Sequence, residues 1–245
     1  MHVTPFAQML VLSRALSLSL PRVSQLSCTR CLNTQSSSES TPRTTSFGFR
    51  NVPEEAKESL VKDVFDSVAS SYDLMNDATS FGVHRLWKDD FVSSLKPGRK
   101  GPMRCLDVAG GTGDIALRIL DYAREKYADR ETSVEVADIN AQMLKEGFRR
   151  FKKTLYHNSA CCTRARQKRS HDSSAPQISF HEANAQALPV AKFSDDTYDL
   201  YTIAFGIRNC TSIPAVLKEA HRVLKPGATF ACLEFGRVNN PLLSL

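Results

Sequence analysis

Acidic residues are missing from the first 38 positions of this 245-residue chain, which carry three arginines and are rich in serine and leucine. This composition is typical of an organellar transit peptide. The apolar stretch 9–20 resembles a secretory signal, but Arg14 interrupts it and no basic segment precedes it. The stretch is also too short to span a membrane as a helix. We therefore expect residues 1–45 to be a mitochondrial transit peptide without a fixed fold.

The chain also lacks a cysteine framework. Of its seven cysteines, Cys28 and Cys31 form one close pair and Cys161 and Cys162 another. Neither pair has a second pair at the spacing of a zinc site, so we predict no metal site. The two cysteines at positions 105 and 232 lie in apolar, strand-like runs and are expected to be small buried residues. This usage fits a reducing compartment.

The formal net charge is +6, and the excess of basic over acidic residues lies in two segments. One is the N-terminal stretch, and the other is 149–169, which holds eight lysines and arginines with no acid between 147 and 171. The rest of the chain is mildly acidic. A nucleic-acid enzyme usually spreads its basic surface around its site, so we expect no nucleic-acid partner. We expect the polar insert 156–176 to be a solvated surface loop.

Strand and helix patterns alternate along most of the chain. A helical segment is expected at 46–100, with helices at 54–70 and 83–95, before a Rossmann-like domain at 101–245. Within that domain the predicted strands are 104–108, 134–138, 178–182, 198–205 and 229–235, and the predicted helices are 114–127, 141–155 and 212–224, with a turn at 225–227. The alternation predicts an α/β fold with a doubly wound, mostly parallel sheet. A ligand is then expected at the carboxyl ends of the strands, beside the first strand.

The segment 106–116, Leu-Asp-Val-Ala-Gly-Gly-Thr-Gly-Asp-Ile-Ala, carries the strongest functional signal. An apolar strand ending in Asp107 enters a glycine-rich turn and then a helix. Glycines allow a ligand to approach the backbone, and the helix N-terminus offers free N–H groups. Asp138 ends the next apolar run, 25 residues after Gly113, where an acid binds ribose hydroxyls. The pattern predicts a nucleoside cofactor.

Two cofactors fit this turn, because Gly111, Gly113 and Ala116 also satisfy the dinucleotide fingerprint. A pyrophosphate would be repelled by Asp107 and Asp114, whereas S-adenosylmethionine is cationic where it would meet them. The acids therefore favour the methyl donor. An NAD-dependent oxidoreductase remains the alternative, and it finds a Tyr-x-x-x-Lys pair at 122 and 126. That pair falls in the later turns of the helix, which lead away from the ligand end of the sheet.

The segment 107–116 resembles class I S-adenosylmethionine-dependent methyltransferases, and other segments narrow the resemblance. The stretches 72–77 (Tyr-Asp-Leu-Met-Asn-Asp) and 80–88 are similar to the first signature of the ubiquinone/menaquinone biosynthesis C-methyltransferase family. The stretches 205–209 (Phe-Gly-Ile-Arg-Asn) and 219–227, continuing to 233–235, are similar to its other signatures. The resemblance covers about 47–243 apart from the insert.

The resemblance implies S-adenosylmethionine as the cofactor, with the ribose held by Asp138 and the adenine faced by the residue at position 184. This chain has asparagine there, where the family has aspartate. An amide oxygen still accepts a hydrogen bond from an exocyclic amine, but without the charge. The cofactor-binding residues carried over in this way are Asp107, Gly110, Gly111, Thr112, Gly113, Asp138, Asn184 and Ala185.

The implied reaction is methylation of a ring carbon of a polyprenylated methoxy-benzoquinol in ubiquinone biosynthesis. Arg208 is expected to stabilise the phenolate and Asn209 to position it, since a guanidinium is permanently charged and is not a simple base. A structural ion pair is the alternative for Arg208. The residues expected to line the ring pocket, or alternatively to cap and pack helices, are Tyr72, Asp73, Asn76 and Asp77.

Three residues near this segment are open to a structural interpretation. His84 is expected to be packed or hydrogen-bonded rather than a catalytic base. Trp87 and Phe91 either flank the polyprenyl tail or belong to the core.

The resemblance also implies a place and partners for the chain. These are peripheral association with the matrix side of the mitochondrial inner membrane, other coenzyme Q biosynthesis proteins and a homodimer. The chain stops soon after residue 235, where such methyltransferases continue with another helix and further strands. We therefore expect a C-terminally truncated sheet in which the last strand has a raw edge. A non-catalytic member of the quinone-biosynthesis complex is the corresponding alternative.

Overall fold

A computed structural model describes residues 7–13, 44–47, 50–53, 80, 82–154, 156 and 177–235 of the chain. For 7–13, 44–47 and 50–53 it describes the backbone only. The predicted helix at 54–70, nearly all of the predicted insert at 156–176 and the last ten residues lie outside these ranges.

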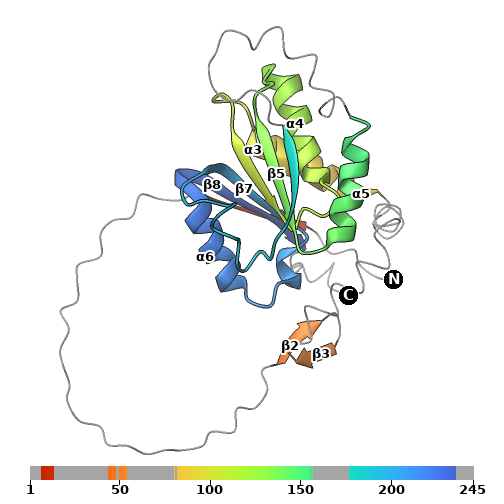
Figure 1. The fold of residues 1–245 in the computed structure, drawn as a ribbon. Helices are drawn as coiled ribbons and strands as arrows, with labels where there is room; N and C mark the ends of the chain where they lie inside the picture. Colours follow the sequence, from red (N-terminus) through yellow and green to blue (C-terminus); the bar gives the residue numbers. More distant parts are fainter. Residues whose placement is uncertain are drawn as a thin grey trace, which may run out of the picture.

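Five parallel strands form the centre of the main sheet (Figure 1). Their spatial order is β6-β5-β4-β7-β8, so the order reverses between β4 and β7. This confirms the predicted doubly wound, Rossmann-like fold and places the switch point at the first strand of the predicted domain. The strands are β4 (Arg104–Val108), β5 (Ser133–Asp138), β6 (Ile178–Glu182), β7 (Tyr198–Ala204) and β8 (Leu224–Phe235).

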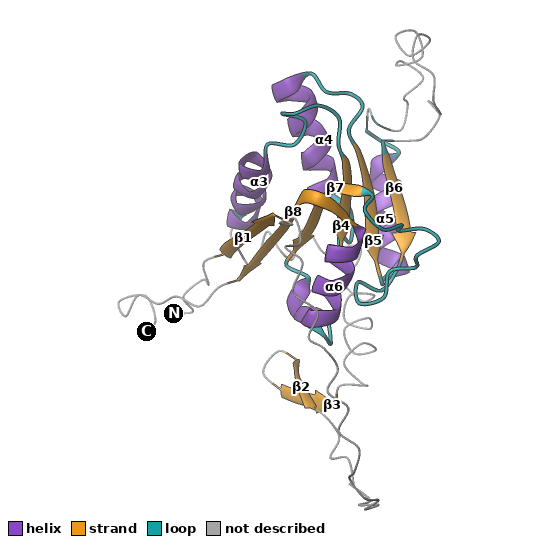
Figure 2. Ribbon diagram, turned by 90° about the vertical axis from the view of Figure 1, so that its left-hand side faces the viewer, coloured by secondary structure: helices purple, strands orange, loops and turns teal. Residues whose placement is uncertain are grey.

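Helices cover both faces of the sheet and bury two separate clusters of apolar side chains (Figure 2). On one face α3 (Val83–Leu95), α4 (Asp114–Tyr127) and α5 (Ala141–Phe151) pack over residues such as Val134 and Val136. On the other face α6 (Ile213–Val223) packs over β7 and β8. The apolar periodicity of each helix decides which of its sides is buried, and the right-handed connections on either side of the switch point decide which face of the sheet it covers.

The predicted elements agree closely with the structure, with two exceptions. Helix α5 ends at Phe151, four residues before the predicted end, because the amphipathic pattern runs into Lys152 and Lys153. The predicted turn at 225–227 is not separate from the last strand, since β8 already starts at Leu224 and pairs there with Tyr198. The register shifts between Tyr198 and Leu200, so the strand accommodates the turn residues as an irregularity.

The expectation that β8 has a raw edge is wrong. Strand β1 (Ala7–Ser13) pairs antiparallel with β8 along its whole length, from Ala7 opposite Phe235 to Ser13 opposite Thr229. Figure 2 shows β1 at this edge of the sheet. The apolar run at the start of the chain, predicted to have no fixed fold, thus supplies the sixth strand because the backbone groups of an edge strand favour pairing. A transit peptide over 1–45 stays a prediction.

A separate two-stranded antiparallel sheet is formed by β2 (Thr44–Phe47) and β3 (Arg50–Pro53). Within the described residues, the helices include none of the length and apolar character that crossing a membrane requires.

Candidate cofactor site

The glycine loop joins β4 to α4 at the carboxyl edge of the sheet. Gly113 is the N-cap of α4 and has φ of +78°, in the left-handed region that glycine adopts without a steric penalty. The Gly113 N–H donates to the carbonyl of Gly110 at 2.8 Å, which closes the turn. The first N–H groups of a helix have no partner within the helix, and those of α4 begin directly after this turn. The loop is therefore a backbone site for a polar ligand.

Asp107 lies beneath the glycine loop with no solvent exposure. Its Oδ1 accepts a hydrogen bond from the Thr202 hydroxyl at 2.8 Å, while its buried Oδ2 has no partner among the described residues. A Cβ on Gly110 would come within 2.7 Å of this second oxygen, so the loop lies directly over the carboxylate. Burial raises the pKa of Asp107 from 3.8 to about 7, with Asp114 and Asp138 adding to the rise and Thr202 opposing it. A carboxylate in this position favours a cation at the loop.

Asp138 ends β5 and is bound to the glycine loop through its side chain. Its Oδ2 accepts from the Gly111 N–H at 2.8 Å, and its Oδ1 accepts from the Asn140 N–H at the same distance. Burial raises its pKa, although these backbone N–H groups oppose the rise. Each carboxylate oxygen has two acceptor sites, so Asp138 retains capacity for ligand hydroxyls while it holds the loop.

The predicted adenine segment follows β6 and starts beside Asp138. The Ala183 N–H donates to the Asp138 carbonyl at 2.9 Å, which joins the start of this segment to the end of β5. Asn184 is partly exposed, and its Oδ1 accepts from the Gln186 N–H at 2.9 Å. Ala185 is buried. The structure thus brings both predicted residues to the edge that carries Asp138 and the glycine loop.

The end of β7 packs tightly against the glycine loop. A Cβ on Gly206 would lie 2.5 Å from the Cβ of Ala109, closer than real side chains approach. Only glycine therefore fits here without a shift. Directly after Gly206 the 3₁₀ helix η3 (Ile207–Asn209) carries Arg208 and Asn209. This contact places the predicted catalytic segment next to the predicted cofactor loop.

Arg208 forms an ion pair, the alternative considered for it from the sequence. Its Nε donates to Glu234 Oε1 at 2.9 Å and its Nη2 to the same oxygen at 2.5 Å. The guanidinium also lies over the ring of Phe235, 4.5 Å from its centre. The Arg208 side chain is nevertheless 48% exposed, so it combines a fixed position with access for a ligand. The Asn209 N–H donates to the Gly206 carbonyl and completes the 3₁₀ turn.

A buried ion pair ties α3 to the start of α4. The Lys88 Nζ donates to Asp114 Oδ2 at 2.7 Å, and the Lys88 side chain is 8% exposed. Burial alone would raise the pKa of Asp114, but Lys88 and Arg118 together hold it below its usual value. Asp114 is thus ionised at the positive end of the α4 dipole, next to the glycine loop.

The aromatic and histidine residues of α3 have structural contacts. His84 is buried, and its Nδ1 forms a hydrogen bond with Ser80 Oγ at 2.7 Å, which confirms the prediction of a packed histidine. Phe91 is buried in the core and does not flank a ligand. Trp87 lies edge-on to Phe235 and near Phe205. The predicted ring-pocket residues at 72, 73, 76 and 77 lie outside the described residues.

The Tyr-x-x-x-Lys pair of the oxidoreductase alternative lies on the later part of α4. Lys126 is exposed, and Tyr122 stacks edge-on against Tyr127. Both side chains are in the last two turns of a helix whose N-terminus meets the glycine loop. They therefore lie away from the end of the sheet where the other predicted site residues meet.

A cavity and the environment of the cysteines lie outside the predicted cofactor site. A cavity of about 600 Å³ lies between α5 and β6, beside Phe148 and Phe180, and none of its lining residues belongs to the predicted cofactor site. Among the described residues no cluster of histidine, cysteine, aspartate or glutamate has the arrangement of a metal site. Cys105 and Cys232 are free and buried, as predicted.

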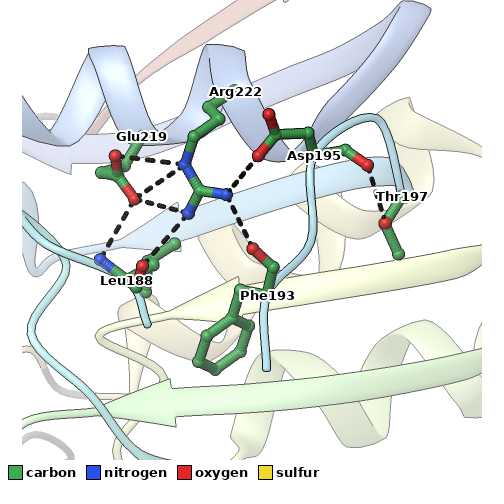
Figure 3. Close-up of polar contacts among 6 residues, drawn as sticks. All are labelled: Leu188, Phe193, Asp195, Thr197, Glu219 and Arg222. Carbon is green, nitrogen blue, oxygen red and sulfur yellow. Dashed lines mark hydrogen bonds and ion pairs between the residues drawn. The ribbon is translucent and has the colours of Figure 1, made fainter. Parts of the chain in front are cut away.

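Several residues that support the site were not found from the sequence. One of them is Thr202. Others form a group of polar contacts in which Arg222 of α6 holds the loop after β6 (Figure 3). Its guanidinium donates to the carbonyls of Leu188 and Phe193, and it pairs with Glu219 and Asp195. The contacts with Leu188, Phe193 and Asp195 join positions 27 to 34 residues apart, and no local spacing signals them, whereas Glu219 lies only three residues before Arg222 on α6.

The chain is similar to a known family and to several named proteins. Residues 53–245 match the ubiE/COQ5 methyltransferase family. The mitochondrial 2-methoxy-6-polyprenyl-1,4-benzoquinol methylase of Schizosaccharomyces pombe is 53% identical over 212 residues, 85% of this chain and 64% of its own length. The protein of the same name from Dictyostelium discoideum is 45% identical over 230 residues, 86% of this chain and 67% of its own. Ubiquinone/menaquinone biosynthesis C-methyltransferase UbiE of Rhodopseudomonas palustris is 48% identical over 203 residues, which are 82% of this chain and 70% of its own length. The chain thus spans less than two thirds of the length of the S. pombe relative.

Proposed function

The chain belongs to the ubiE/COQ5 methyltransferase family, and on this premise we propose that it transfers a methyl group from S-adenosylmethionine to a ring carbon of a polyprenylated methoxy-benzoquinol. The observation that carries the proposal is the contact between Gly206 and Ala109, which joins the glycine loop to the segment of Arg208. A methyl transfer needs its two reactants in one place, and this contact supports such a site.

The residues at the glycine loop fit this cofactor. Asp107 is a buried carboxylate with one oxygen unpartnered, under a loop whose backbone approaches a ligand closely. Its charge attracts a sulfonium and an amino group, and repels a pyrophosphate. Asp138 would hold the ribose, the N–H groups of Gly111 to Gly113 and Thr112 would meet the amino acid part, and Asn184 with Ala185 would face the adenine.

When bound, S-adenosylmethionine supplies a methyl carbon that an electron-rich ring carbon attacks, with the broken S–C bond leaving its electron pair on sulfur. The ring carbon becomes nucleophilic when a ring hydroxyl loses its proton, and the methylated carbon then loses its own proton to solvent. Arg208 is permanently charged, so it stabilises the phenolate without accepting the proton. Glu234 and Phe235 fix the direction of that guanidinium. Asn209 positions the ring, and the residues at 72, 73, 76 and 77 would line its pocket.

We further propose a mitochondrial location, on the matrix side of the inner membrane. The acid-free, arginine-bearing N-terminus and the names of the S. pombe and D. discoideum relatives support the organelle. A polyprenyl substrate partitions into a bilayer, which supports peripheral association. A homodimer and contacts with other coenzyme Q biosynthesis proteins belong to the same proposal.

Calorimetric titration of the full chain with S-adenosylmethionine, and separately with NAD, tests the cofactor. We expect saturable binding of the methyl donor and no binding of NAD. Asp138→Ala should lose this binding, because the Gly111 N–H then has no acceptor and the ribose has no carboxylate to bind. Glu131→Gln, which changes an exposed acid, serves as the matched control and should bind as the unchanged chain does. Binding of NAD alone would support the oxidoreductase, and a folded chain that binds neither would support a non-catalytic role.

Transfer of a labelled methyl group to a reduced short-chain prenyl quinol tests the reaction. We expect Arg208→Lys to lower kcat by about 10²-fold or more, since a lysine does not reproduce the planar contact with Glu234 and Phe235. Binding of S-adenosylmethionine should change little in this variant. Equal turnover by both proteins would contradict the electrostatic role.

A further inference from the structure

Gln186 connects the two halves of the site, although no part of the sequence analysis assigned it a role. It lies in the loop 183–193 that follows β6, two residues after Asn184. Its backbone N–H donates to Asn184 Oδ1 at 2.9 Å. Its side-chain Oε1 accepts from the Ser212 N–H at 2.5 Å. One residue therefore contacts both the predicted adenine residue and the start of α6.

The hydrogen bond from the Ser212 N–H to Gln186 takes the place of a capping bond that no side chain of α6 supplies. Ser212 is the N-cap of α6, and its hydroxyl accepts from the Ala215 N–H. In a capping box the residue three positions after the N-cap is a glutamate or glutamine that accepts from the N-cap N–H. Here that position is Ala215, which has no acceptor, and Gln186 supplies one from a distant loop.

The rest of the loop is fixed to the same helix. Arg222 of α6 donates to the Leu188 carbonyl at 3.1 Å and to the Phe193 carbonyl at 2.7 Å (Figure 3). Glu219, one turn earlier, accepts from the Leu188 N–H at 3.1 Å and pairs with Arg222. The Arg222 and Glu219 side chains are 20% and 15% exposed, so water screens these contacts little. With 188–193 held in this way, the rest of the loop is the short turn 184–187, which the Ala187 N–H closes by donating to the Asn184 carbonyl at 3.0 Å.

The start of α6 is also the continuation of the segment that carries Arg208. Only Cys210 and Thr211 separate Asn209 from Ser212. Asn184 is therefore linked to the turn that holds Arg208 and Asn209 through Gln186 and the Ser212 N–H. This link couples the two sites when a ligand favours the state in which both hydrogen bonds are made.

We propose that Gln186 is a positioning residue that transmits occupancy of the cofactor loop to the substrate-side segment 207–212, so that cofactor binding prepares the site for the substrate. This inference rests on the proposed function, because it takes S-adenosylmethionine as the ligand at Asn184. It assigns to Gln186 no contact with either reactant.

Hydrogen exchange of the full-length chain, with and without S-adenosylhomocysteine, tests the proposal without a turnover assay. In the unchanged protein the ligand should slow exchange at the amides of 209–215, of which Pro214 has none, roughly fivefold, the effect of one hydrogen bond. Gln186→Met, which lacks the acceptor, should lose this slowing while amides 110–114 are still protected. Gln186→Glu keeps an acceptor for the Ser212 N–H and should restore it.

The outcomes separate the proposal from its premise. If the ligand protects no amide of the unchanged, folded protein and calorimetry shows no binding, the cofactor assignment fails. If amides 110–114 are protected but 209–215 are not, or if Gln186→Met keeps the slowing at 209–215, the coupling fails while the cofactor assignment stands. Gln186→Met is a surface-loop change, and a far-ultraviolet spectrum like that of the unchanged protein establishes its folding.

Discussion

The Thr202 hydroxyl donates to Asp107 Oδ1 at 2.8 Å between two neighbouring parallel strands, and both residues are fully buried. This bond satisfies one oxygen of a carboxylate whose other oxygen has no partner among the described residues. An incompletely satisfied, buried acid is costly for the fold, and such groups concentrate at functional sites. The protonation state of Asp107 therefore affects both the stability of the sheet and the charge beneath the glycine loop.

The contribution of Asp107 to the free energy of unfolding should fall as pH rises from about 4 to about 7. The pKa of Asp107 is raised from 3.8 to about 7, so over this window the unfolded chain loses a proton that the folded chain keeps. Stability is then highest below the ordinary pKa and is lost as pH approaches the folded value, by about 4 kcal/mol at most. Urea unfolding at several pH values measures the slope.

Asp107→Asn provides the comparison for that slope. Asp138, whose pKa is also raised, adds a slope of the same sign, and Asp114 and His181, whose pKa values are lowered, add slopes of the opposite sign. All three remain in the variant, so the difference between the two proteins isolates Asp107. Identical pH dependence in the two proteins would show that Asp107 does not titrate in this range.

Binding of S-adenosylmethionine should release a proton at Asp107 when the pH is below about 7. A cationic ligand favours the ionised carboxylate, so affinity should rise by up to about tenfold per pH unit below that value and level off above it. Titration calorimetry in two buffers of different ionisation enthalpy measures the released proton directly. An affinity independent of pH between 5.5 and 8 would argue against Asp107 as the partner of the positive charge.

Gly206→Ala should weaken both the fold and cofactor binding. Gly206 has φ of −112°, which alanine adopts without strain, so the change acts only through the contact of the new Cβ with Ala109. Overpacking of this kind costs about 1–3 kcal/mol and displaces the glycine loop. Ala109→Gly in the same chain removes the opposing Cβ and should recover most of the loss. No recovery in the double variant would point to a different cause.

Lys88→Met should lower the free energy of unfolding by about 1 kcal/mol or more, because the partly exposed Asp114 carboxylate loses its buried partner and keeps only Arg118. The double variant Lys88→Met with Asp114→Asn should lose less than the sum of the two single changes. Lys126→Met, an exposed lysine on α4, is the control for loss of charge. Additive losses in the double-mutant cycle would mean that the pair contributes nothing.

Strand β1 allows a test with two neighbouring prolines. Leu10 lies opposite Cys232 and Val11 opposite Ala231 in an antiparallel pair, where successive N–H groups point alternately toward and away from the partner strand. Leu10→Pro and Val11→Pro should therefore differ. One removes a bond to β8 and lowers the melting temperature, and the other removes none and changes it little. Two equal melting temperatures would contradict the pairing.

The sequence predicted the sheet, its helices and the cofactor loop because the signals for them are local. The periodicity of α4, the glycines at 110, 111 and 113 and the acid at 138 all lie within short windows of the chain. It also placed Arg208 beside the loop correctly through the order of the strands. These features need only the spacing of residues along a strand or a helix.

The contacts that support the site residues could not be predicted from the sequence, because they join positions that are distant along the chain. Thr202 meets Asp107 across 95 residues, and Glu234 meets Arg208 across 26. The strand at 7–13 was missed for a different reason. Its composition fits a transit peptide, and a short apolar run shows no sign of the edge with which it pairs.

The pairing of β1 with β8 sets an order of events for the chain as it is made. A ribosome makes residues 7–13 long before residues 224–235, so β1 has no partner strand while the chain between them is synthesised. Contacts this distant in sequence form slowly, and an unpaired apolar strand is open to association with other chains in the meantime. Completion of this sheet therefore depends on how long β1 is kept apart from other chains before β8 has been made.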